Sequence, residues 1–84
     1  MNVIEVQKKA LPQITELLKQ EPEIISSIEK GKDGWIVQCD VLEKKSIPET
    51  FDILKIFEFK FDNEAKVVGF KQLKKIRRGE VNQS

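Results

Sequence analysis

Residues 34–79 read GWIVQCDVLEKKSIPETFDILKIFEFKFDNEAKVVGFKQLKKIRRG and contain the pattern that decides the fold. In three stretches of this segment, apolar residues are frequent and alternate with polar ones. These stretches are residues 35–43, 53–61 and 67–77. The proline-containing break SIPETFD separates the first two stretches, and the polar cluster DNEAK separates the last two. Alternation with a period of two is typical of half-buried antiparallel strands joined by short turns. The segment therefore predicts three consecutive strands of one sheet.

The alternation also predicts which side chains form the core. The residues expected on the buried face are Trp35, Val37, Cys39, Val41, Phe57, Phe59 and Phe61. Leu54 and Ile56 project from the opposite face of their strand. If that second face is uncovered, Leu54 and Ile56 form an exposed apolar patch, which argues for a partner or a homodimer.

The segment before residue 34 predicts a helix and one more strand. Apolar residues recur every three or four positions from Ala10 to Leu18, which is typical of an amphipathic helix. Pro12 is tolerated in the first turn of a helix and costs about 3 kcal/mol deeper inside one, so we expect a helix at about residues 10–20. The alternative, an earlier helical piece at 3–9 that bends at Pro12, stays open. Residues 23–30 predict a short strand.

These elements predict an α+β fold in a single domain, residues 1–84. The N-terminal helix is expected to pack on one face of a four-stranded antiparallel meander that spans about residues 23–77 and ends in a frayed tail at 79–84. The sequence lacks the run of roughly 18 apolar residues that a membrane span needs, and its N-terminus lacks the apolar core of a signal peptide. We therefore expect a cytoplasmic protein.

Residue types that are absent exclude most catalytic chemistry. The chain has no histidine and one cysteine, which excludes histidine bases, Ser-His and Cys-His pairs, and zinc sites made of histidine or of several cysteines. Cys39 lies within an apolar alternation, where a free thiol behaves as a small hydrophobe. We expect no enzyme activity, no catalytic residue, no metal, no cofactor and no small-molecule substrate.

Charge is distributed unevenly along the chain. The formal net charge is +1, but acidic residues exceed basic ones before residue 44 and the reverse holds after it. The cations of the last predicted strand are Lys71, Lys74, Lys75, Arg77 and Arg78. A solvated strand end or a docking patch for an acidic protein is the favoured interpretation of these residues. Contact with nucleic-acid phosphates is the alternative, and it is less favoured because only Phe70 adds an aromatic ring to the cluster.

The motifs in residues 34–79 resemble, in order and spacing, those of the gas vesicle protein O family. The matching pieces are Gly34-Trp35, CDVLE at 39–43, IPETFD at 47–52, FEFKFD at 57–62 and the final strand from Phe70 to Arg78. The chain departs from the family pattern at Ser46, where a basic residue is usual, at Glu49, where Asp is usual, and at Ile76, where an aromatic residue is common.

The resemblance implies an accessory protein of gas vesicle formation that is cytoplasmic, associated with gas vesicles and not catalytic. It implies binding to other gas vesicle proteins during assembly, with a nucleic-acid-binding regulator of gas vesicle gene expression as the alternative. The residues that we expect to contact a partner are Lys71, Lys74, Lys75, Arg77, Arg78, Leu54 and Ile56.

Overall fold

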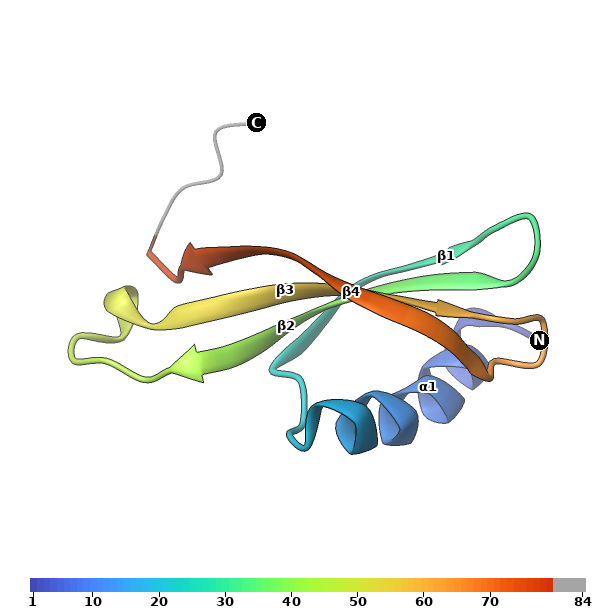
Figure 1. Ribbon diagram of the computed structural model, residues 1–84, viewed down its shortest axis with the longest axis horizontal. Helices are drawn as coiled ribbons and strands as arrows, with labels where there is room; N and C mark the ends of the chain where they lie inside the picture. Colours follow the sequence, from blue (N-terminus) through green and yellow to red (C-terminus); the bar gives the residue numbers. More distant parts are fainter. Residues whose placement is uncertain (80–84) are drawn as a thin grey trace.

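The computed structural model describes residues 1–79 and contains one helix and one antiparallel sheet. The elements are α1 (Val3–Leu18), β1 (Ile24–Lys30), β2 (Trp35–Lys44), the 3-10 turn η1 (Glu49–Phe51), β3 (Ile53–Phe61) and β4 (Val67–Arg77). The strands pair in the order β1-β2-β3-β4, which confirms the predicted meander (Figure 1). Of the expected tail at 79–84, residues 80–84 lie outside the described part of the chain.

Helix α1 begins at Val3, so the expected start near Ala10 is wrong. Asn2 caps the first turn: its Oδ1 accepts a hydrogen bond from the Glu5 backbone N–H at 2.9 Å, and Glu5 Oε1 accepts one from the Asn2 N–H at 3.0 Å. This reciprocal capping box satisfies two N–H groups that have no partner within the helix. Residues 3–9 therefore belong to the helix, as the alternative interpretation allowed.

Pro12 lies inside α1, where its ring removes one backbone hydrogen bond. The neighbouring Gln13 supplies polar contacts at this point, since its Nε2 donates to the Lys9 carbonyl at 2.9 Å and to the Ala65 carbonyl at 2.7 Å. Its Oε1 accepts from the Val67 N–H at 2.8 Å. Gln13 therefore ties the helix, beside its proline, to the hairpin between β3 and β4.

The core lies between α1 and one face of the sheet. All seven residues expected on the buried strand face are buried, and they pack with Val6, Ala10 and Ile14 of the helix. This confirms the faces that the alternation predicted. In the described part of the chain, no helix combines the length and apolar character needed to cross a membrane.

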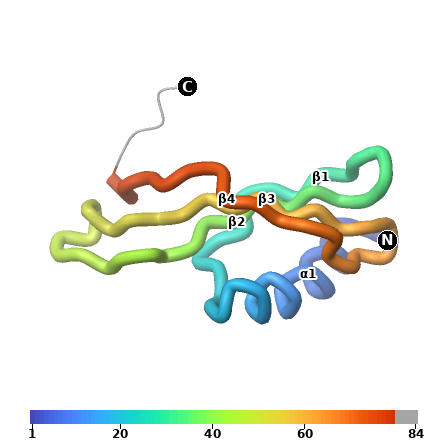
Figure 2. The backbone as a smooth tube through the Cα atoms, in the orientation of Figure 1, coloured from blue at the N-terminus to red at the C-terminus, as the bar shows by residue number. Residues whose placement is uncertain are grey.

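The helix covers only part of the sheet. Figures 1 and 2 show α1 beneath the half that holds the β1–β2 and β3–β4 hairpins, while the connector between β2 and β3 extends beyond the helix at the far end. We call this segment, residues 45–52, the connector. The sheet is therefore backed by a helix at one end and is a single layer at the other.

Candidate interaction surface

Strand β4 forms one edge of the sheet and carries the predicted cations. It pairs with β3 on one side, and the segment from Val67 to Arg78 contains no acidic residue. We call Lys71, Lys74, Lys75 and Arg77 the basic edge. An edge strand presents backbone N–H and C=O groups that an additional strand can pair with. Cationic side chains and an open strand edge are thus combined in one place.

Two lysines of the basic edge contact carboxylates yet stay accessible. Lys75 Nζ lies 3.0 Å from Glu43 Oε1, and Lys71 Nζ lies 4.0 Å from Glu58 Oε1, with the two lysine side chains 55% and 64% exposed. The hydrogen bond from Lys75 is the main cause that lowers the pKa of Glu43. Exposed ion pairs of this kind contribute little to stability. Both ammonium groups can therefore exchange an internal carboxylate for one on a partner.

The other two members of the basic edge have different neighbours. The positive charge of Lys74 acts on Asp40, whose pKa is nevertheless raised by burial first and by the nearby Glu23 second. The Arg77 guanidinium lies 5.7 Å from the centroid of the Phe51 ring, in cation–π geometry. The basic edge consequently extends from the middle of β4 to Phe51, near the end of the connector.

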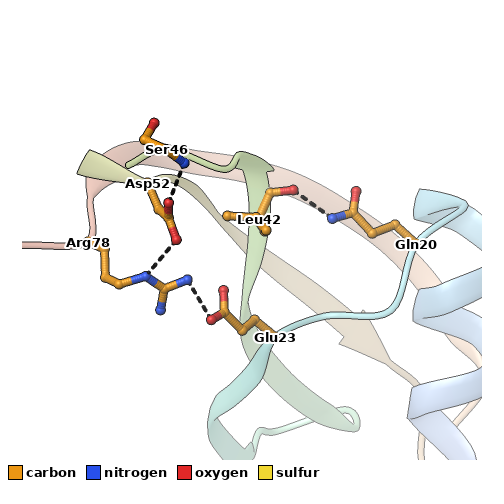
Figure 3. A network of polar contacts seen from close by, with 6 residues as sticks. All are labelled: Gln20, Glu23, Leu42, Ser46, Asp52 and Arg78. Atoms are coloured by element: carbon orange, nitrogen blue, oxygen red, sulfur yellow. Dashed lines mark hydrogen bonds and ion pairs between the residues drawn. The ribbon is translucent and has the colours of Figure 1, made fainter. Parts of the chain in front are cut away.

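Arg78 differs from these cations because it holds parts of the chain together (Figure 3). Its Nη2 lies 2.6 Å from Glu23 Oε1 and its Nε lies 3.0 Å from Asp52 Oδ2. Asp52 is only 2% exposed, and its Oδ1 accepts a hydrogen bond from the Ser46 N–H at 2.6 Å. That bond, followed by Arg78, lowers the pKa of Asp52. We therefore assign Arg78 to anchoring the connector and exclude it from the basic edge.

Leu54 and Ile56 do not form an exposed patch, since each is only 6% exposed. They lie on the face opposite α1, as predicted, but that face is not open at their position. Leu54 borders a shallow hollow of about 230 Å³ together with Glu23, Ile24 and Arg78. The long side chain of Arg78 reaches across this face to Glu23, a contact between distant residues that the strand pattern does not reveal.

Cys39 is fully buried, and burial followed by the charge of Asp40 raises the pKa of its thiol to about 11. At pH 8 only about one thiol in a thousand is then ionised. We predict that iodoacetamide leaves the folded protein unmodified and alkylates Cys39 once urea unfolds the chain, as mass spectrometry would measure. Rapid alkylation of the folded protein would contradict the buried position.

Sequence reasoning missed the exposed apolar residues of the connector. Ile47 is 98% exposed and Phe51 is 50% exposed. Their signal was an isoleucine and a phenylalanine in a break that is otherwise polar. Among the described residues, no group of three or more histidine, cysteine or acidic side chains is placed to hold a metal ion.

Comparison with known proteins places the chain among gas vesicle proteins. The sequence model of a family described as "Gas vesicle synthesis protein GvpO" matches residues 1–82. Gas vesicle protein O of Streptomyces sp. (strain CB03234) is 32% identical over 79 residues, which cover 94% of this chain and 62% of the relative. Gas vesicle protein O of Haloferax mediterranei is 32% identical over 80 residues, which cover 94% of this chain and 57% of the relative.

A third relative, gas vesicle protein O1 of Halobacterium salinarum, is 29% identical over 77 residues, which cover 92% of this chain and 65% of the relative. The matches thus span between 57% and 65% of the length of these curated relatives. No solved structure matches the chain.

Proposed function

The chain belongs to the gas vesicle protein O family, and from this premise we propose that it acts in gas vesicle formation by binding other gas vesicle proteins. The description of the family as a gas vesicle synthesis protein supports a role in gas vesicle formation. The matches cover less than two thirds of the length of these relatives. The role of the full-length proteins is therefore carried over to this chain only as a proposal. The activity we propose is non-enzymatic and takes place in the cytoplasm at the growing gas vesicle.

The basic edge is the observation that supports binding. It combines exposed cations with an edge strand, and the same strand leaves Phe70 44% exposed and Leu73 39% exposed. Backbone pairing supplies affinity in strand addition, and side chains supply selectivity. The surface therefore fits an extended, acidic segment of another gas vesicle protein.

Charge argues against a second copy of this chain at the basic edge. Two β4 edges placed side by side bring lysine and arginine residues opposite one another, which is destabilising. The nucleic-acid alternative has less support, because Phe70 is the one aromatic residue of β4 and one face of its ring is already stacked on Phe59 with 4.8 Å between centroids, whereas single-strand binders stack successive bases on several rings. An acidic protein partner remains the interpretation that we propose.

Charge reversal on the basic edge tests the proposal. We predict that the double substitution Lys71→Glu and Lys74→Glu weakens binding to a purified gas vesicle protein encoded with this chain by about tenfold or more, since attraction becomes repulsion. Calorimetry against each such protein in turn measures the effect.

The matched control is Lys8→Glu with Lys9→Glu, which reverses two exposed charges on the helix. Both double variants should keep the wild-type melting temperature within a few degrees, so a change in affinity is not a folding effect. If the wild-type chain binds none of these proteins at micromolar concentration, the proposed function is wrong.

A further inference from the structure

The connector lies at the end of the molecule farthest from α1 (Figure 1). Two of its large apolar side chains are exposed. We call Ile47 and Phe51 the connector tip. With 98% of its surface exposed, Ile47 makes almost no contact within the described part of the chain. Transfer of one such side chain from water into an apolar pocket strengthens an association by roughly tenfold or more.

The connector tip is held in a defined conformation by hydrogen bonds on both sides of it. Within the connector, the Phe51 N–H donates to the Pro48 carbonyl at 3.0 Å, and the Asp52 N–H donates to the Glu49 carbonyl at 2.9 Å. The bond from the Ser46 N–H to the buried Asp52 carboxylate closes the loop just before Ile47.

The two residues that follow β4 also hold the connector, through backbone hydrogen bonds. The Arg78 N–H donates to the Asp52 carbonyl at 2.8 Å, and the Gly79 N–H donates to the Thr50 carbonyl at 2.8 Å. A partner that binds the tip therefore spends little free energy on ordering it, because the loop conformation already exists in the free chain.

The charges next to the connector tip are mostly positive. Lys44 and Lys45 precede it, and both are exposed. Arg77 pairs in the sheet with Ile53, which also faces Lys44, and its guanidinium lies over the Phe51 ring. Glu49 is the one acidic residue in the connector before Asp52. A complementary surface would thus combine an apolar pocket with carboxylates around it.

We propose that the connector tip is a second contact surface, which inserts Ile47 and Phe51 into an apolar pocket rimmed by carboxylates on another gas vesicle protein. This inference rests on the proposed function. It adds an apolar anchor to the electrostatic contact of the basic edge. Central apolar anchors in a desolvated pocket usually account for most of the affinity of an interface, while rim charges set its rate of formation.

The substitution Ile47→Ser tests the connector tip. It removes the exposed apolar side chain without touching the core, so the melting temperature should not change. We expect it to weaken binding to the partner gas vesicle protein by about tenfold or more in calorimetry. The matched control is Ile4→Ser, which makes the same chemical change at a helix position that is 66% exposed, and it should leave binding unaltered.

The possible results separate this inference from the proposed function. If the wild-type chain binds a gas vesicle protein and Ile47→Ser binds it equally well, the connector tip is not a contact surface, although the proposed function stands. If the wild-type chain binds none of them, both are wrong. If sedimentation shows that the chain self-associates and that Ile47→Ser abolishes this, the tip contacts a second copy and the inference of an acid-rimmed partner is overturned.

Discussion

The substitution Gly34→Ala is expected to destabilise the protein by about 3 kcal/mol or more, or to prevent folding. A Cβ atom at this position would lie 1.9 Å from the Phe61 carbonyl oxygen and 2.8 Å from the Asp62 Cα. Both are backbone atoms, one in the last residue of β3 and one in the residue after it, so no side-chain rotation relieves the clash. The φ angle of Gly34 is also +157°, a conformation that residues with a Cβ rarely adopt.

Two other glycines provide controls for this prediction. A Cβ at Gly69 would meet no atom within 4 Å, and one at Gly31 would make contacts of 3.5 Å or longer. Alanine at either position should change the free energy of unfolding by about 1 kcal/mol or less. Urea titrations followed by circular dichroism compare the three variants. A Gly34→Ala protein as stable as the Gly69→Ala protein would contradict the close approach of β2 to the end of β3.

The substitution Asp52→Ala is expected to lower the melting temperature by roughly 10 °C. It leaves the Ser46 N–H without its acceptor and removes one of the two carboxylates that hold Arg78. Differential scanning calorimetry measures the shift. Glu49→Ala, which removes an exposed carboxylate from the same connector, is the control and should leave the melting temperature nearly unchanged. Equal melting temperatures for both variants would show that the connector is not anchored through Asp52.

Lowering the pH should reduce the contribution of Asp52 to the stability of the folded protein. Its pKa is lowered in the folded protein, first by the Ser46 N–H and then by Arg78, so between the folded pKa and the ordinary value of about 3.9 the unfolded chain binds more protons. The stabilisation is therefore complete above about pH 5 and is lost as the pH falls through the folded pKa. The difference in stability between the wild type and Asp52→Asn should narrow from pH 7 to pH 3.

The pH dependence of stability expected from Asp40 has the opposite sign. Its pKa is raised, mainly by burial, so the folded state favours the protonated carboxyl. Any stability that Asp40 contributes is present below its ordinary pKa and is lost as the pH rises through the raised value. At neutral pH we therefore expect Asp40→Asn to leave stability unchanged or to increase it, whereas Asp52→Asn decreases it.

The strands were predictable because their side chains repeat with a period that is visible locally. Residues such as Val37 and Phe59 lie on the buried face whichever strands pair with their own. The alternation alone was therefore sufficient to assign them to that face. The helix start was misjudged because the cost of Pro12 was weighed without the contacts of its neighbour. Two of the three side-chain hydrogen bonds of Gln13 reach Ala65 and Val67, and such distant partners cannot be identified from the local sequence.

The cations of the candidate site were identified from the sequence, but their partners were not. Arg77 and Arg78 are adjacent in the chain, yet one lies over the Phe51 ring and the other contacts Glu23 and Asp52. Successive side chains on an extended segment point to opposite faces, which explains the divergence. The Asn2-x-x-Glu5 capping box, by contrast, was present in the local sequence and would have given the correct helix start.

The ion pair between Glu23 and Arg78 also bears on the order of events in folding. It joins a residue just before the first strand to one just after the last, so all four strands lie within the loop that it closes. Closing so long a loop has an entropic cost that is offset only once the intervening strands have paired. We infer that the contact forms after the rate-limiting step. The ion pair then mainly lowers the unfolding rate and has little effect on the folding rate.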